Sequence, residues 1–400
     1  DPYVGKLTYL FDENHTANVG ISGQPTSTTL PVPGVGNLAA GFYPNGSPTT
    51  RIASTDLNVF DVIGNYTGRF LDRKLVLTVT AGYHVQSQKD RPTDAQMSAP
   101  TVIWNQDGAQ ALGGTVTDFE RVPAGWCTNP ATCRVTGYQT GGWPFGFVYD
   151  GQASRFVVRP ALAWLADLGA GGTMNLKFGG EYALSNYDVT KAYSGGALFR
   201  NLGGDFFGIG YGTVNVPGGI TTDPNQATYL PSFTTRSYSD NYALFVQDSW
   251  TLASVTVNLG VRWDGQTMRS SSNPEANGFG IYDMVSPRVQ GIWDFTGTGR
   301  GKLAGSWGRF YYSMPLDLGD RAFGAESLVF YQQTCPIAPN TPGSFPTGTL
   351  TKPYPGGGLG PNTPTCSVAS VQQVGGATPV QPDLKGAYVD QFNVQLQYEV

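Results

Sequence analysis

The sequence has few charged residues, few histidines and cysteines, and no long hydrophobic run. Charged residues make up 13% of the chain, whereas typical soluble domains contain about 25%. No segment approaches the ~18 consecutive apolar residues that indicate a transmembrane helix. The 24 basic and 29 acidic residues leave a net charge of −5, which does not indicate a nucleic-acid partner. These absences argue against ordinary soluble domains, a helical membrane protein and a nucleic-acid-binding protein.

The sequence also lacks a recognisable catalytic or cofactor-binding pattern. It contains no nucleophile elbow and no Cys/His pair at a diagnostic spacing. The segment 297–302, GTGRGK, lacks the first glycine of a phosphate-binding loop and is followed by Leu303 instead of Ser or Thr. A turn between strands is the favoured interpretation. His84 is better explained as an inward-facing strand residue than as a metal ligand or a base. We therefore predict no enzymatic activity, no cofactor and no metal site.

Glycine, aromatic residues and alternating segments dominate what is present. The chain contains 54 Gly, 21 Tyr, 21 Phe and 8 Trp. Within 255–264, apolar and polar or small residues alternate, with Val255, Val257, Leu259, Val261 and Trp263 on one face and Thr256, Asn258, Gly260, Arg262 and Asp264 on the other. The preceding run, 242–252, alternates in the same way and is interrupted at Asp248. A period of two predicts strands with one apolar face. Each run reaches the length of about 9–11 residues with which a tilted strand crosses a bilayer.

The same pattern recurs along the chain and predicts about eleven antiparallel strands. They lie at 4–11, 15–23, 56–70, 74–89, 154–168, 173–193, 242–252, 255–265, 285–295, 302–312 and 388–400. The faces of 302–312 are not assigned by the pattern. Short turns are expected at 12–14, 71–73, 169–172, 253–254 and 296–300, and long irregular loops at about 24–55, 90–153, 194–235, 269–284 and 313–386. Alternating short and long connections are typical of bacterial outer-membrane barrels, with short periplasmic turns and long extracellular loops. The predicted fold class is all-β, an antiparallel transmembrane β-barrel.

Bacterial barrels usually have an even number of strands, and an open edge cannot lie in lipid. Eleven strands therefore leave two explanations, strands missed by the pattern or a piece of a larger barrel. The chain stops at the end of a predicted strand, which favours a piece. It opens at Asp1 without a basic and apolar leader, so we expect an export signal to have been removed or not included.

Several residue groups are candidates for specific roles. The even cysteine count predicts two loop disulfides, Cys127–Cys133 and Cys335–Cys366, with four free thiols as the alternative. An aromatic girdle at the membrane interface is predicted from Trp164, Trp250, Trp263 and Trp293. Loop aromatics that could contact a ligand, or simply pack loop on loop, are Trp126, Tyr138, Trp143, Phe145, Phe206, Phe207 and Tyr211. The loop acids Asp317, Asp320 and Glu326 could bind Ca²⁺, but a solvated loop is the favoured interpretation.

Several stretches carry a family likeness. FVQDSW followed by LASVTVNLGVRWDG resembles a barrel hairpin of TonB-dependent receptors, and VSPRVQGIWDFTGTGRGKLAGSWGRFYYSMP is similar to the SPRxG strand, Gly-rich turn and GxGRFY strand of the same group. LDLGDRAFG, PDLKGAYVDQFNVQLQYEV and GKLTYLFDENHTANVGISG resemble the Oar-like TonB-dependent proteins more narrowly. The likeness is strongest in 236–400 and weakest in the long loops.

The resemblance implies a 22-stranded barrel with an N-terminal plug domain and a TonB box, of which this chain would supply about half the strands and neither of the other parts. It also implies a transporter in the bacterial outer membrane that moves a bulky or scarce substrate. Its partners would be outer-membrane lipid, the substrate and the TonB–ExbB–ExbD energy-coupling system. The alternatives are a diffusive porin, a structural or adhesive surface barrel and, least favoured, a secreted soluble β-protein.

Overall fold

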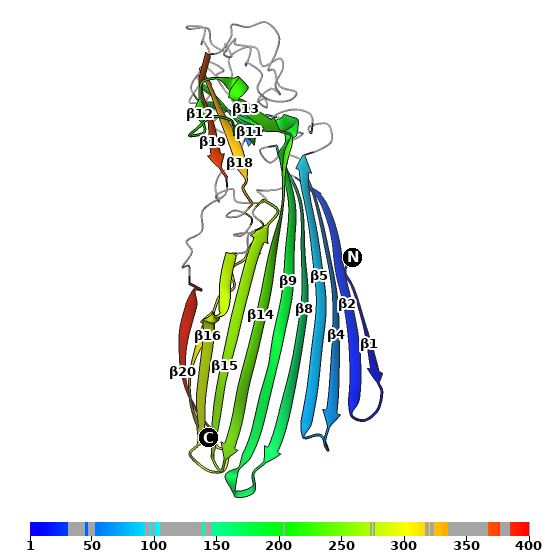
Figure 1. Cartoon of the computed structure of the whole chain (residues 1–400). Helices are drawn as coiled ribbons and strands as arrows, with labels where there is room; N and C mark the ends of the chain where they lie inside the picture. Colours follow the sequence, from blue (N-terminus) through cyan, green and yellow to red (C-terminus); the bar gives the residue numbers. More distant parts are fainter. Residues whose placement is uncertain are drawn as a thin grey trace.

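The computed structural model describes residues 1–30, 45–46, 53–92, 97, 101–104, 138–140, 146–202, 205–272, 274, 277–316, 320, 324–334, 367–376 and 385–399. Almost all of this part of the chain is β-structure, arranged in two sheets (Figure 1). No helix in these ranges is long and apolar enough to cross a membrane.

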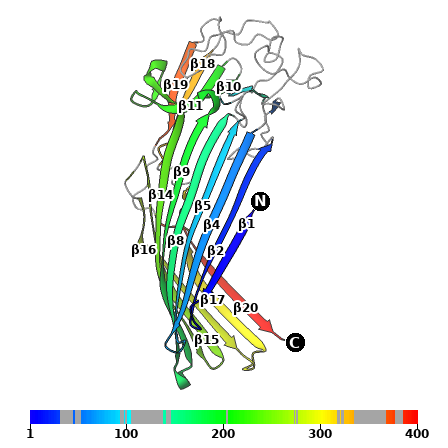
Figure 2. The ribbon, with the colours of Figure 1, turned by 90° about the vertical axis from the view of Figure 1, so that its right-hand side faces the viewer.

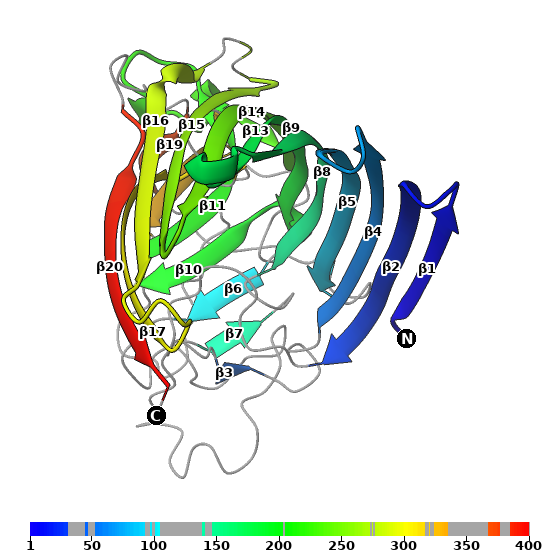
Figure 3. The ribbon, with the colours of Figure 1, turned by 90° about the horizontal axis from the view of Figure 1, so that it is seen from below.

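The larger sheet is an eleven-stranded antiparallel meander, as the sequence predicts. Its order is β1-β2-β4-β5-β8-β9-β14-β15-β16-β17-β20. The strands are β1 (Tyr3–Leu10), β2 (His15–Leu30), β4 (Ala53–Phe70), β5 (Leu75–Pro92), β8 (Phe147–Asp167), β9 (Thr173–Tyr193), β14 (Ser232–Leu252), β15 (Val255–Ser270), β16 (Asn277–Asp294), β17 (Gly301–Tyr311) and β20 (Tyr388–Tyr398). The sheet curves into an open arc with β1 and β20 at its two ends (Figure 3).

The two faces of this sheet differ in polarity and in exposure. Leu259 of β15 pairs with Asp248 of β14 and Val289 of β16, and the side chain of Leu259 is 54% exposed. One position along, Asn258 donates a hydrogen bond to Gln290 at 2.9 Å. Small and polar side chains on this second face are buried, for example Ser239 at 1%. Side chains converge on the concave face of a curved sheet and diverge on the convex face, so the polar face is the inner one.

The outward apolar side chains leave the larger sheet without a hydrophobic core of its own. Among the described residues, much of the buried apolar packing lies elsewhere, for example at Tyr211, Val329, Tyr331 and Val371 in the smaller sheet. Exposed large apolar side chains on this scale are unusual for a soluble protein. They are expected for strands whose outer solvent is lipid. Together with the all-antiparallel order, they define the fold as a transmembrane β-barrel wall.

The short turns lie at one end of the sheet and the long connections leave from the other (Figure 1). All five predicted turns are present, and two of them use non-glycine residues with positive φ, at Leu71, Asp72, Arg73 and Ala253. In the last turn, the Asp294 carboxylate accepts hydrogen bonds from the backbone N–H groups of Thr296, Gly297 and Gly299. This carboxylate stabilises a glycine-rich turn, as the sequence predicts for 297–302.

The prediction that the long loops are irregular is wrong over much of their described length. Segments from different loops pair into a second sheet of order β12-β19-β18-β11-β10-β6-β7-β3, with β13 paired to β11. Its strands are β3 (Asn45–Gly46), β6 (Thr101–Trp104), β7 (Tyr138–Thr140), β10 (Leu198–Leu202), β11 (Asp205–Val214), β12 (Ile220–Thr221), β13 (Ala227–Leu230), β18 (Ser327–Thr334) and β19 (Ser367–Gly375). Most of these strands are too short to show a clear period of two, and several pair with strands distant in sequence, as β11 does with β18.

Several wall strands are also longer than predicted, whereas β1, β9 and β17 have the predicted length and β20 is shorter. β14 begins at Ser232, and β15 and β16 reach Ser270 and Asn277. The connection predicted at 269–284 is therefore much shorter. The extensions lie beyond the outward apolar residues, where the alternation between apolar and polar residues is lost. Backbone pairing continues there because hydrogen bonding does not require the apolar pattern.

The described edge strands each have one partner. β1 pairs with β2, and β20 pairs with β17. The two strands do not pair with each other within the described residues, and they lie apart in the end-on view (Figure 3). In the side view of Figure 2, β1 and β20 run in different directions and the two chain ends lie apart. The arrangement matches the predicted open edges.

Candidate functional site

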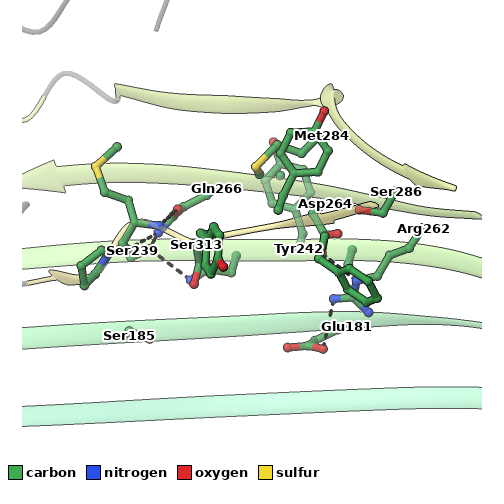
Figure 4. Close-up of a pocket in the computed structure, with 18 of the residues that line it drawn as sticks. Glu181, Ser185, Ser239, Tyr242, Arg262, Asp264, Gln266, Met284, Ser286 and Ser313 are labelled. Carbon is green, nitrogen blue, oxygen red and sulfur yellow. Dashed lines mark hydrogen bonds and ion pairs between the residues drawn. The ribbon is translucent and has the colours of Figure 1, made fainter. Parts of the chain in front are cut away.

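A cavity of about 410 Å³ lies against the inner face of the wall. Strands β8, β9, β14, β15, β16 and β17 supply its lining, and the segment 312–316 supplies the rest. The lining is mainly charged and hydroxyl-bearing, with Glu181, Arg262, Asp264 and several serines from neighbouring strands (Figure 4). Ligand-binding sites are usually concave and hold a few convergent polar groups that fix the ligand's orientation; this cavity shares both features but has a more polar lining.

One glutamate organises the charges of this cavity. Glu181 accepts from Arg159, with Nε–Oε2 at 3.1 Å and Nη2–Oε1 at 3.2 Å. Arg262 Nη2 lies 3.4 Å from Oε2, and Arg155 Nη2 lies 3.8 Å from Oε1. Three guanidinium groups from two other strands therefore share one carboxylate. Such charge-assisted contacts fix the direction of long side chains.

The small side chain of Ala243 makes this cluster possible. Ala243 of β14 is the cross-strand partner of both Glu181 in β9 and Asp264 in β15. Because a methyl group occupies the intervening position, Arg262 can reach across β14 to Glu181. Its Nε also contacts Asp264 Oδ1 at 2.8 Å. The alternation of the sequence indicated that Arg262 and Asp264 are polar-face residues, but it did not indicate that Arg262 meets Glu181.

A strap, defined here as residues 312–316, lies over the inner face and is held by Gln266. The Gln266 carboxamide donates to the Met314 carbonyl at 2.8 Å and accepts from the Met314 N–H at 2.7 Å. Its Nε2 also donates to Ser239 Oγ at 3.0 Å. The Gln266 side chain is 2% exposed. Its carboxamide pairs with both backbone groups of Met314, as the backbone of a neighbouring strand would. The strap forms part of the cavity lining at this point.

A second anchor lies further along the same connection. Lys191 Nζ contacts Asp320 Oδ2 at 2.9 Å and Glu326 Oε2 at 2.6 Å. The Tyr211 hydroxyl donates to Glu326 Oε1 at 3.2 Å. The sequence favoured a solvated loop for these acids. That expectation is wrong for Asp320, whose side chain is 5% exposed. Asp317 lies outside the described residues, and the described part of the chain holds no group of three or more His, Cys, Asp or Glu that could hold a metal ion.

Lys191 lies above the apolar band of the wall. β9 is 21 residues long, which at about 3.3 Å per residue and a tilt of ~45° carries its upper end roughly 50 Å from the turn, beyond the ~25 Å apolar band. Burial favours the neutral amine, but the hydrogen bonds and charges of Glu326 and Asp320 outweigh it and raise the pKa of Lys191. Burial first, and then the charge of Glu326, raise the pKa of the Tyr211 hydroxyl. Lys191 is therefore charged at neutral pH, and the Tyr211 hydroxyl keeps its proton.

The predicted loop aromatics fall into three groups. Tyr211 is 2% exposed, and its ring stacks on those of Tyr193 and Phe233 at 5.6 and 5.8 Å. Phe206 and Phe207 lie in β11 and Tyr138 in β7. Outside the described residues lie Trp126, Trp143 and Phe145, together with Cys127, Cys133, Cys335 and Cys366. A role for the loop aromatics in ligand contact stays a prediction.

The predicted girdle residues lie on the outer face. Trp164, Trp250 and Trp293 are exposed near the short-turn ends of β8, β14 and β16, and Trp263 is half-buried. Trp250 Nε1 donates to the Gly171 carbonyl in the neighbouring turn at 2.8 Å. The structure also assigns the faces of β17, which the sequence left open. Trp307 pairs with Val289 and Phe392, so it points outward.

The curved wall, its apolar outer face and the cavity on its polar inner face define part of a transmembrane β-barrel. No family model matches the chain. The sequence is 29% identical over 429 residues to "TonB-dependent transporter Oar" of Myxococcus xanthus, covering 100% of this chain and 39% of the relative. This match confirms the resemblance to Oar-like TonB-dependent proteins. It also agrees with the non-enzymatic function that the sequence predicts. The chain spans about two fifths of the length of this relative.

Solved structures with a similar arrangement include two outer-membrane proteins. The outer membrane transporter YddB from Escherichia coli is 14% identical, with a TM-score of 0.46 over 84% of this chain and 38% of that one. The alcaligin outer-membrane receptor FauA from Bordetella pertussis is 10% identical, with a TM-score of 0.46 over 99% of this chain and 53% of that one.

Proposed function

We propose that the chain forms part of the wall of a TonB-dependent transporter of the bacterial outer membrane. The observation that carries this proposal is the match to the Myxococcus xanthus transporter along the full chain. The structure supports it because the sheet has an apolar convex face for lipid and a polar concave face for a lumen. The cavity beneath the strap would then be a binding site that the cargo occupies during its passage through the lumen.

The barrel would be completed by parts of the protein beyond these 400 residues. Eleven strands leave two open edges in the described sheet, and unpaired backbone groups cannot lie in hydrocarbon. A barrel of 22 strands would pair both edges and leave room for a plug domain. Its partners would be outer-membrane lipid, a bulky or scarce substrate, and the TonB–ExbB–ExbD system acting through the plug.

The long connections would face the cell exterior and the short turns the periplasm, as is usual for bacterial barrels. The second sheet would then stand above the membrane, where it can capture cargo. The two anchors at Gln266 and Lys191 hold the connection after β17 against the inside of the wall. This connection would narrow the upper lumen.

Two measurements on the complete purified protein test the proposal. It should bind the isolated periplasmic domain of TonB, and it should not let sugars swell liposomes in which it is reconstituted. Rapid swelling together with no TonB binding would replace the proposal with a diffusive porin. A closed barrel that does not bind TonB would indicate a structural or adhesive surface barrel instead.

The cysteines would form two disulfides in the extracellular loops, Cys127–Cys133 and Cys335–Cys366. An exported protein with an even cysteine count is expected to oxidise its thiols. Non-reducing peptide mapping of the complete protein should recover one linked peptide pair for each bridge. Links between the two groups, or four alkylatable thiols, would contradict this pairing. Reducing the bridges should leave the barrel folded, because the wall's hydrogen bonds do not depend on them.

A further inference from the structure

Arg288 is an inward-facing arginine of β16 that has no carboxylate partner among the described residues. The ion pairs of the inner wall engage Arg155, Arg159 and Arg262 with Glu181 and Asp264. Arg288 is exposed, and its guanidinium lies over the ring of Phe310, with Cζ 4.5 Å from the ring centroid. The aromatic face fixes the orientation of the guanidinium group, whose N–H donors stay available for a ligand.

The backbone around Arg288 leaves an open space beside its side chain. Its cross-strand partners are Gly260 in β15 and Gly308 in β17, so no side chain stands next to it on either neighbouring strand. A Cβ on Gly308 would lie 3.3 Å from Arg288 Cγ and 3.2 Å from Phe310 Cε2. The glycine therefore leaves room for the arginine to lie on the ring. Arg288 lines both the 410 Å³ cavity and a neighbouring cavity of about 320 Å³.

The local charge is positive although the chain as a whole carries −5. Four guanidinium groups, those of Arg155, Arg159, Arg262 and Arg288, face two carboxylates. Glu181 and Asp264 are both engaged by the first three arginines. The positive charge of Arg288 is therefore left without compensation within this cluster. Guanidinium groups bind carboxylates and phosphates through parallel hydrogen bonds, and a concave surface lined by charges of one sign strengthens that attraction.

We propose that Arg288 is the centre of an anion-binding subsite on the inner wall, which takes a carboxylate or phosphate group carried by the cargo. The inference rests on the proposed function in one respect, that cargo passes through the lumen. The same anionic chemistry could come from an acidic side chain of the protein's remaining segments, and the experiment separates the two sources.

The test measures local potential at a cysteine placed two residues from Arg288 on the same face. The complete protein carries Gln290→Cys, and the protein without this change gives the background from native cysteines. Labelling rates are compared for two thiol reagents of equal size, one carrying a sulfonate and one a quaternary ammonium. We expect the anionic reagent to react faster, and Arg288→Gln to lower the ratio of the two rates by about 3- to 10-fold.

Lys302→Gln is the matched control. Lys302 is a basic residue of the inner face that pairs with Asp294 at the short-turn end, far from Arg288 along the strand, and its removal should leave the ratio unchanged. Inorganic phosphate should slow anionic labelling in the arginine protein and have no effect in the Arg288→Gln variant. Gly308→Ala should reduce phosphate protection, because the methyl group would displace the arginine.

The outcomes are distinct. A ratio that does not respond to Arg288→Gln would overturn the subsite. A cysteine that neither reagent reaches, together with a lower melting temperature for Arg288→Gln, would show that the protein's own acidic segment fills it and would overturn the assignment to cargo. A ratio that depends on Arg288 in a protein that swells liposomes and does not bind TonB would support the subsite and reject TonB-dependent transport.

Discussion

Leu259 and Asn258 are neighbours in β15 whose side chains lie on opposite faces of the wall. Leu259→Arg places a charge in the apolar band and should destabilise the folded barrel by about 2–4 kcal/mol, whereas Asn258→Arg faces the polar lumen and should cost much less. Unfolding titrations of the complete barrel in lipid vesicles measure both. Equal costs at the two positions would contradict the facing of the strand.

Lys191 gives a second prediction at this scale. Lys191→Met leaves the buried Asp320 and the partly buried Glu326 without their cation, and breaking a buried pair costs about 3–5 kcal/mol. The expected result is local opening of β18 from β11, seen as faster hydrogen exchange. Arg73→Met is the control, because the Arg73–Glu13 pair spans 3.7 Å between exposed side chains and should contribute almost nothing.

The same junction should respond to pH. The folded-state pKa of Lys191 is raised, so the folded protein holds this proton more tightly than the unfolded chain. Its contribution to stability is complete below the ordinary lysine pKa of about 10.4 and is lost as the pH rises through the folded value. Exchange of β18 in the wild-type protein should accelerate only above that pH. The Lys191→Met variant should show no corresponding step.

At the scale of elements, the strap depends on one carboxamide. Gln266→Ala removes both hydrogen bonds to the Met314 backbone, and a buried group left without its partner costs about 1–3 kcal/mol. We expect the strap to leave the inner wall, which a spin label at Ser313 would report as increased motion. Gln395→Ala changes an inward glutamine of β20 that is remote from the strap. Its spectrum should match the wild type, and a change there would show a general loosening of the wall.

At the scale of the whole molecule, the open edges should control assembly. Residues 1–400 expressed alone should not insert as a heat-modifiable barrel, because β1 and β20 each present a row of unpaired N–H and C=O groups. They should aggregate or dimerise through these strands. In the complete protein both strands should pair with neighbours outside the 400 residues. Cross-linking that joins β1 to β20 within one chain would contradict this and would favour a small porin.

The sequence alone determined the wall. Alternation at 255–264 predicts which residues face lipid, because a strand points successive side chains to opposite faces whatever its partners are. The turns at 71–73 and 253–254 follow from the breaks between alternating runs. These are local properties, so they can be read from neighbouring residues. The same reading identified Arg262 and Asp264 as polar-face residues.

Only the tertiary structure decided what those residues do together. Glu181 and Arg262 are 81 positions apart in the chain, and their contact depends on the register of three strands and on the small side chain of Ala243. Lys191 meets Asp320 and Glu326 because the connection after β17 folds back over the inner wall. The second sheet arises from loops that have no pattern of their own. Strand register and long-range pairing set these contacts, and neither is recorded in the local order of residues.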